Sequence, residues 1–380
     1  PPPAESCNLV DDDCDGAIDN AVSALVDLGS IDLPFVTPST EYVHTLKAVS
    51  TSNGIVVFAL IKRQSEYRLY GYRLSDDGEV VEGPVRSVTR GWSSGLPGGP
   101  LDVAVAGNVA YVAMPPNTEE PTFGGGPELV RVSLVDLREV DSVGVPFLLG
   151  FVVWESHCIA ATETGVAWGH RFTSLERTPS TQALVQFYDP SLEEGEVYPL
   201  RSLLGDGSDV PQCALSAATG AQEGKWVMAY DASPYIELAV LQADVGDLFS
   251  KSLRGADADV FLSMVRDPFG EFVVVGRYTA WDLWRYALDA DLEEVDRRLG
   301  FGQGGRRGDA IYGRRLAAAD GRTFLAGSVL GIQSRDALEG LQSLTPPVSD
   351  AMVVHKGRVF VIGADENAAL MRLYEIGCAP

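Results

Sequence analysis

The sequence predicts an all-β protein: a seven-bladed β-propeller that is closed by an N-terminal outer strand and preceded by a short N-terminal metal-binding loop. Three observations predict this class. A glycine-led apolar strand recurs along the chain, further strands accompany most copies, and the last copy is one strand short. Repeats of this size indicate an array of small sheets, because each repeat forms one supersecondary unit.

The repeated unit is a loop glycine followed by a short strand rich in Val, Phe, Ala and Trp. Successive glycines are 36 to 59 residues apart. Short apolar runs bounded by turn residues are typical of strands. The seven glycines are Gly54, Gly107, Gly165, Gly224, Gly270, Gly321 and Gly357.

Each glycine follows an apolar strand, such as 101–105, and a third strand usually comes after it, such as 67–74. Acidic turns then lead to a weaker fourth strand, and four antiparallel strands make one blade. We therefore divide the chain into an acidic loop, 1–23, and a propeller, 24–380. The expected blades are 40–90, 98–149, 151–204, 209–255, 256–301, 304–347 and 349–380, the last completed by 24–37.

The last repeat ends soon after its third strand and needs an outer strand from elsewhere. The segment 24–36 can supply that strand, which would join the two ends of the ring and protect exposed sheet edges. Six or eight blades are the next options. A two-sheet sandwich followed by a second β domain would not predict seven similar units.

Two of the five cysteines support the repeat alignment. Cys158 and Cys213 each lie seven residues before a glycine and continue as similar strands, so we expect them at matching places on neighbouring innermost strands. A disulfide between adjacent blades is one interpretation, if the separation satisfies disulfide geometry. Two buried free thiols are the alternative.

The other cysteines leave several pairings open. Cys7 and Cys14 flank the acidic loop and are candidates to clamp it, but Cys378 could capture either one after ring closure. The odd count leaves one thiol unpaired or used between molecules. The combined pattern favours an oxidising compartment.

The acidic loop places carboxylates at alternate positions ahead of a turn glycine, Gly16, as in an EF-hand loop. Calcium is the expected cofactor, because its irregular oxygen coordination suits a short loop better than the strict octahedron of magnesium. Val22 replaces the bidentate Glu at position 12, so we expect an affinity of about 10⁻⁴ to 10⁻³ M and no sensor role. Another hard cation and a disordered acidic tail are the alternatives. The expected ligands are Asp11, Asp13, Asp15, the carbonyl of Ala17, and Asp19.

The arrangement C-N-x-x-D-D-D-C-D-G-x-x-D-[NE] at residues 7–20 resembles the metal-binding motif named after the bacterial surface protein MopE. That motif recurs in secreted and cell-surface bacterial proteins. The resemblance implies a metal-binding loop in such a protein and says nothing about residues beyond 20.

Composition narrows the partners. The chain has 29 Lys and Arg against 53 Asp and Glu, a formal charge of −24. Nucleic acid and anionic membrane surfaces are therefore disfavoured, because no basic stripe offsets the field. No apolar run reaches the roughly 20 residues of a membrane span. We expect an extracellular, cell-surface or periplasmic protein whose signal peptide was removed or lies outside this chain.

Catalytic signals are sparse. The four histidines fall at unrelated places in their repeats, and no H-E-x-x-H or nucleophile elbow is present. A zinc set of His157, Cys158, His170 and Cys213 lacks the spacing of a closed site. The arginines near 306–315 are expected to pair with acidic turns or to contact an anion. Trp92, in a loop, is expected either to bind a partner or to pack locally.

Two classes of function follow. The favoured one is a non-catalytic propeller that presents loops to a protein or glycan, alone or as part of a surface assembly. The alternative is a polysaccharide lyase or glycosidase acting at the central funnel. Charged side chains that converge on one mouth of the funnel would favour the enzyme over the non-catalytic propeller. Members of such a set could include Glu155, His157, Asp209, Asp259 and Arg314.

Overall fold

The computed structural model of the chain describes most of the strands and the turns between them. All structural statements below concern these parts of the chain. The described residues are 22–32, 41–63, 66–91, 101–114, 127–144, 152–174, 180–199, 213–217, 224–231, 236–243, 246–253, 262–266, 272–277, 282–288, 294–303, 315–319, 322–326, 329–334, 338–343, 351–365 and 370–378.

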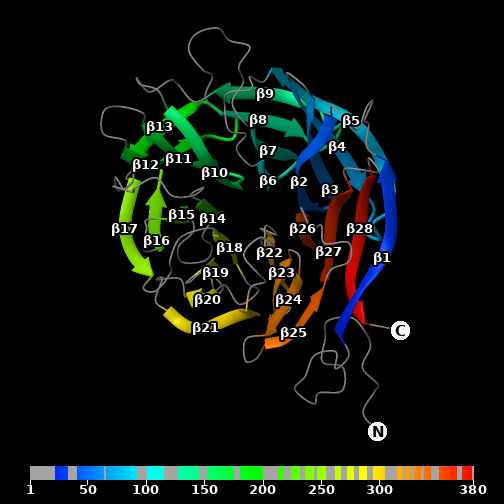
Figure 1. Cartoon of the computed structure of the whole chain (residues 1–380). Helices are drawn as coiled ribbons and strands as arrows, with labels where there is room; N and C mark the ends of the chain where they lie inside the picture. Colours follow the sequence, from blue (N-terminus) through cyan, green and yellow to red (C-terminus); the bar gives the residue numbers. More distant parts are fainter. Residues whose placement is uncertain are drawn as a thin grey trace.

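The described residues form strands and turns without a helix, which confirms the all-β prediction for this part of the chain. Accordingly, the described residues offer no helix with the length and apolar character needed to cross a membrane. Twenty-eight strands form seven four-stranded antiparallel sheets, and Figure 1 shows these sheets side by side around a ring.

The first three sheets follow the order of the chain. The first sheet contains β2 (Glu41–Thr51), β3 (Gly54–Arg63), β4 (Glu66–Leu74) and β5 (Val80–Gly91). The second contains β6 (Asp102–Ala106), β7 (Val109–Met114), β8 (Glu128–Ser133) and β9 (Glu139–Gly144). The third contains β10 (Val152–Thr162), β11 (Gly165–Ser174), β12 (Ser180–Tyr188) and β13 (Glu194–Pro199).

The next three sheets repeat this order. The fourth contains β14 (Cys213–Ala217), β15 (Lys225–Asp231), β16 (Ile236–Gln242) and β17 (Gly246–Leu253). The fifth contains β18 (Leu262–Arg266), β19 (Phe272–Arg277), β20 (Asp282–Leu288) and β21 (Glu294–Gln303). The sixth contains β22 (Arg315–Ala319), β23 (Arg322–Ala326), β24 (Val329–Ser334) and β25 (Leu338–Ser343).

The seventh sheet combines both ends of the described chain. It contains β26 (Ala351–His355), β27 (Arg358–Asp365), β28 (Leu370–Cys378) and β1 (Val22–Asp32). β1 pairs antiparallel with β28, from Val22 opposite Cys378 to Asp32 opposite Leu370. In Figure 1 the blue β1 lies beside the red β28 at the rim.

The apolar cores lie between neighbouring sheets. Ile55 and Val57 of β3 belong to a core shared with the seventh sheet, whereas Val56 and Phe58 belong to one shared with the second. Alternate side chains of a strand point to opposite faces, so a strand that is covered on both faces is apolar throughout. This explains why the glycine-led strands have continuous apolar sequences and why Trp168, in β11, is fully buried.

The repeated glycine is the first residue of the second strand of a sheet or lies one or two residues before it. Gly54 is the first residue of β3 and has a φ of +111°, and a Cβ there would lie 2.1 Å from the carbonyl oxygen of Leu74. Glycine reaches this conformation without a steric penalty. Gly270 and Gly321 lie outside the described residues, but β19 and β23 begin within two residues of them.

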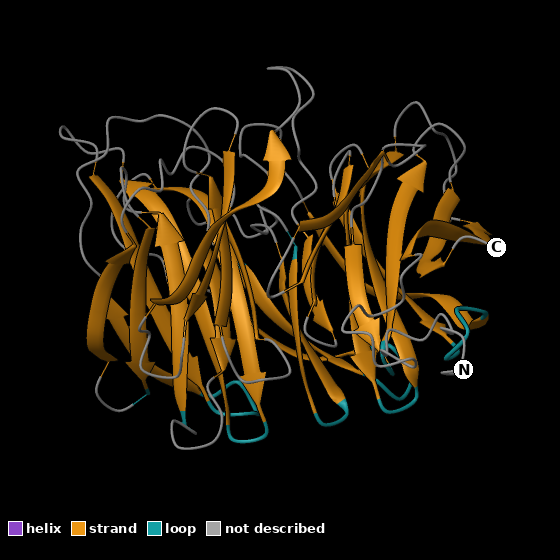
Figure 2. Ribbon diagram, turned by 90° about the horizontal axis from the view of Figure 1, so that it is seen from below, coloured by secondary structure: helices purple, strands orange, loops and turns teal. Residues whose placement is uncertain are grey.

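The described turns between first and second strands, and between third and fourth strands, lie at the same end of the sheets (Figure 2). Antiparallel connectivity requires this. Successive strands run in opposite directions, so the first and third connections of a sheet lie at one end and the second lies at the other. We call this end the turn face. Its described turns are 51–54, 75–79, 107–108, 133–138, 163–164, 189–193 and 356–357.

Candidate functional site

The contacts between neighbouring sheets, here called seams, share one feature at the turn face. A side chain of one sheet donates a hydrogen bond to a main-chain carbonyl in the third-to-fourth-strand turn of the next sheet. This occurs at four consecutive seams. The donors and acceptors are Arg358 to Asp76, Arg73 to Leu134, Tyr111 to Pro190, and Tyr198 to Ala243.

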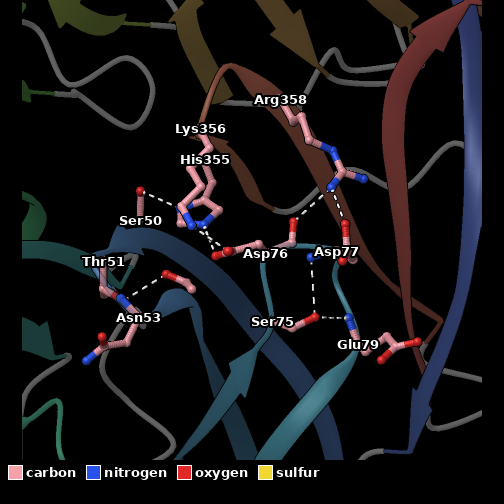
Figure 3. A network of polar contacts seen from close by, with 11 residues as sticks. Ser50, Thr51, Asn53, Ser75, Asp76, Asp77, Glu79, His355, Lys356 and Arg358 are labelled. Carbon is pink, nitrogen blue, oxygen red and sulfur yellow. Dashed lines mark hydrogen bonds and ion pairs between the residues drawn. The ribbon is translucent and has the colours of Figure 1, made fainter. Parts of the chain in front are cut away.

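The seam between the seventh and first sheets also carries a network of charged side chains (Figure 3). His355, at the end of β26, is buried and contacts two residues of the first sheet. Its Nδ1 lies 2.9 Å from Ser50 Oγ, and its Nε2 lies 2.7 Å from Asp76 Oδ1. Lys356 Nζ donates to the other oxygen of Asp76.

The partners of His355 fix its tautomer when the ring is neutral. An ionised carboxylate can only accept hydrogen bonds, so Nε2 must carry the proton that faces Asp76. Nδ1 then accepts the hydroxyl proton of Ser50. Hydrogen bonds from Lys356 and then His355 hold the pKa of the Asp76 carboxyl below its usual value, so Asp76 is ionised near neutral pH.

Arg358 extends this network along β27. Its Nη1 donates to the carbonyl oxygen of Asp76 at 3.0 Å and to Asp77 Oδ1 at 2.7 Å. Its Nε and Nη2 form a bidentate pair with Glu375 of β28, at 2.6 Å each. These hydrogen bonds, those to Glu375 first, raise the pKa of the Arg358 guanidinium. The first sheet is thereby linked to two strands of the seventh.

The order Ser50, His355, Asp76 is the order of groups in a hydrolase triad. Such a triad needs a carboxylate that orients the base and stabilises its cation. Here Nδ1 of His355 faces Ser50 and Nε2 faces Asp76, which reverses the ring nitrogens of the Ser-His-Asp triad, and both contacts join the seventh sheet to the first. The geometry therefore supports a structural fastening between the sheets.

A hollow of about 190 Å³ opens on the turn face at the seam between the first and second sheets. Its walls are the turns that begin β3 and β7, the side chain of Arg73, and the turn after β8. The residues that line it are Thr51, Ser52, Asn53, Arg73, Gly107, Asn108, Leu134 and Val135.

The hollow is held in shape by its own hydrogen bonds. Leu134 N donates to the carbonyl oxygen of Asn108 at 2.8 Å. Arg73 Nη2 donates to the carbonyls of Leu134 and Val135, and its Nε pairs with Glu82 at 3.1 Å. The wall formed by the second sheet is therefore tied to the first.

The seam between the third and fourth sheets is closed by a disulfide. Cys158 of β10 and Cys213 of β14 are bonded, and their Cα atoms lie 5.6 Å apart, within the usual range for disulfides. The sequence left a disulfide or two free thiols open, and the structure has the disulfide. Two members of the zinc set weighed above are therefore engaged with each other.

Most other candidate residues lie outside the described part of the chain. This holds for the expected calcium ligands Asp11, Asp13, Asp15, Ala17 and Asp19, for Cys7 and Cys14, and for Trp92, Asp209, Asp259 and Arg314. Glu155, His157 and His170 lie in described strands, but their side chains are not described. Among the described residues, no three His, Cys, Asp or Glu side chains are grouped as metal ligands.

Sequence reasoning missed the His355 network and the hollow. His355 and its two partners come from distant parts of the chain, with Ser50 and His355 separated by 305 residues and Asp76 and His355 by 279. A partial signal was present. The acidic turn follows the predicted strand 67–74, and His355 and Lys356 directly precede Gly357, which leads another predicted strand. Repeat alignment would place both at the turn face.

Comparison with known proteins identifies the fold class. The β-propeller domain of Cps50 (Swd1) from Myceliophteria thermophila superposes with a TM-score of 0.50 at 12% identity, covering 87% of this chain and 96% of that one. The chain therefore has a β-propeller fold. BBS1N, in its complex with ARL6DN, gives a TM-score of 0.49 at 9% identity, with 93% and 97% covered. The Dos1 propeller gives 0.47 at 7% identity, with 93% and 96% covered.

The sequence comparisons find no relative. No family model matches the chain, and no curated protein matches it. At 12% identity the structural likeness shows the fold alone. Function therefore has to be argued from the residues of this chain.

Proposed function

We propose that this chain is a secreted or cell-surface, non-catalytic β-propeller that binds a protein or glycan partner. In this proposal the seven sheets are the seven blades, β1 closes the ring, and a calcium-binding loop precedes it. The pairing of β1 with β28 supports the closure, since it gives the seventh sheet its fourth strand.

The observation that carries a binding function is the fastening of the turns. At four consecutive seams a turn of one sheet is bonded to a side chain of the preceding sheet. Turns that are already ordered lose little conformational freedom when a partner binds, which favours recognition. Rigid scaffolds commonly use their loops in this way.

Secretion is supported by the disulfide between Cys158 and Cys213. Disulfides persist in oxidising compartments and are rare in the cytosol. The resemblance of residues 7–20 to the MopE motif agrees with that location. We therefore expect the partner on a cell surface or in the surrounding medium.

The binding function is tested by exposing the purified chain to arrays of extracellular glycans and of secreted proteins, with the urea-unfolded chain as control. Saturable binding that requires the folded chain is expected. New reducing ends or unsaturated sugars released from polysaccharides would instead favour a glycosidase or lyase and contradict this proposal.

The calcium loop is tested by chelation. Millimolar calcium should raise the melting temperature of the chain, because a ligand that binds only the folded state stabilises it by RT ln(1 + [L]/Kd). Asp13→Ala together with Asp15→Ala should remove the response. A melting temperature that is the same with calcium and with chelator in the unmutated chain would contradict the loop.

A further inference from the structure

We propose that the hollow between the first and second sheets is the docking site for an extended protein segment in which one apolar side chain is flanked by Lys or Arg. This inference rests on the proposed binding function and names the partner's chemistry. The segment would place its apolar side chain against Leu134 and Val135, with its basic side chains over the surrounding turns.

The apolar part of the site is Val135. Its relative exposure of 74% is the largest among the exposed large apolar residues of the described chain. Val135 lines the hollow beside the buried Leu134. An exposed apolar residue at the lip of a hollow offers a partner more buried area than one on a convex surface, and such anchor pockets dominate protein interfaces.

The hollow also offers polar groups suited to a peptide backbone. Asn53 and Asn108 are exposed and lie on its opposite sides, one in each of the two first-to-second-strand turns. A side-chain amide has both a donor and an acceptor, so it can bond a peptide N–H or C=O. A hollow of about 190 Å³ is below the 300–1,000 Å³ typical of small-molecule pockets, and we assign it to a single side chain.

The charge of the turn face selects a basic segment. The described turns contain seven carboxylates and two cationic side chains, Arg138 and Lys356. Arg358 pairs with Asp77, Lys356 with Asp76, and Arg73 with Glu82, so five of the seven turn carboxylates and Arg138 stand outside these ion pairs. The acidic side chains are Asp76, Asp77, Glu79, Asp136, Glu163, Asp189 and Glu193. This excess, in a chain of formal charge −24, attracts cations.

The outer edge of the first sheet is a poorer site for the same partner. Val80 and Val81 are exposed at the start of β5. However, the pairing of β4 with β5 has three register shifts, and β5 contains Pro84. Bulges and proline protect an edge strand from the addition of another strand. The ordered hollow has no such obstacle.

The test uses the full chain and a labelled nine-residue peptide with leucine at its centre, lysine at four flanking positions, and blocked ends. Fluorescence anisotropy measures its binding. We expect saturable binding that weakens as salt rises, and at least tenfold weaker binding for the same peptide with glutamate in place of lysine. Replacing the central leucine by serine should also weaken binding three- to tenfold.

Two matched variants locate the site. Val135→Ser should weaken binding of the lysine peptide three- to tenfold, whereas Val197→Ser should leave it unchanged, because Val197 is an exposed valine of β13 in the third sheet. Both should melt within about 2 °C of the parent chain, since surface substitutions usually change stability little.

Equal effects of the two serine variants, or equal binding of the acidic peptide, would overturn the proposal. The absence of saturable binding up to millimolar peptide would overturn it as well. None of these three results bears on the array experiments, which test the binding function at every surface of the ring. Failure there together with peptide binding here would leave the hollow as a binding site and count against the glycans and secreted proteins of the arrays as its partners.

Discussion

Two seams of the ring join neighbouring sheets by different chemistry. One lies between the third and fourth sheets, and the other lies between the seventh and first sheets. The former has a covalent bond between Cys158 and Cys213. Phe187 and Trp226 belong to the same apolar cluster as Cys158, and the centroids of their two rings lie 5.1 Å apart. The latter has His355, Lys356 and Arg358 bonded to one acidic turn.

The difference follows from how the two seams are connected. The third and fourth sheets are consecutive in the chain, and their cysteines are 55 residues apart. The seventh and first sheets meet only when the chain ends come together, and His355 and Asp76 are 279 residues apart. A long loop is entropically more costly to close. Directional polar contacts at that seam add to an apolar core that includes Ile55, Val57 and Phe360.

The largest expected effect tests the covalent seam. Replacing both Cys158 and Cys213 by alanine should lower the free energy of unfolding by about 4 kcal/mol, between the values expected for 15-residue and 100-residue loops. Urea denaturation of the double variant and the parent chain measures this. A loss below about 1 kcal/mol would show that the packing around Trp226 holds the seam without the bond.

Reduction provides the control for that substitution. Cys158 is buried, so a reductant should act slowly on the folded chain and quickly once it unfolds. Unfolding the parent chain in reductant should therefore reproduce the behaviour of the double variant. A parent chain that remains as stable in reductant as without it would contradict the assignment.

A smaller effect is expected at the polar seam. His355→Ala removes a buried side chain with two hydrogen bonds and should cost about 1–3 kcal/mol. Lys356→Ala is the matched control. Its side chain is 58% exposed and its ion pair with Asp76 lies at the surface, so the cost should be at most about 1 kcal/mol. Equal costs of the two variants would place the strength of the seam in its charges and not in the buried imidazole.

The repeat and its exceptions explain what the sequence could predict. Continuous apolar strands after a glycine, such as 54–60, are dictated by burial on both faces, and that pattern is visible in one dimension. The positions of Cys158 and Cys213 were predictable from the repeat as well, since equal offsets within it place them on neighbouring innermost strands.

The hydrogen bonds between side chains of one repeat and turns of the next were not predictable, because they depend on which turns the ring brings together. His355 has no counterpart at the same position in the other repeats, so spacing alone gave it no partner. The same holds for Arg73, whose target is a carbonyl oxygen of the next sheet and not a side chain. Main-chain acceptors leave no trace in sequence.

The smallest expected effect is the acid sensitivity of the polar seam. The pKa of Asp76 is lowered in the folded chain, chiefly by Lys356 and then by His355, with Arg358 bonded to its carbonyl oxygen and Asp77 beside it. Its ionised form therefore stabilises the fold above the unfolded pKa, near 4. This contribution is lost as pH falls through the lower, folded pKa.

Asp76→Asn isolates that contribution. Melting temperatures of the variant and the parent chain should differ at pH 6 and converge toward pH 2.5, because the parent loses the ionised carboxylate that the variant lacks at every pH. The parent alone is not a sufficient test, since the pKa values of Asp136 and Asp189 are also lowered, by hydrogen bonds from Ser133 and Ser191. Asp189→Asn, in a turn of the third sheet, is the control. It measures the pH dependence of stability that comes from a turn carboxylate outside this seam. A difference between Asp76→Asn and the parent that stays constant across this range would mean that the shape of the side chain, and not its charge, holds the ends of the ring together.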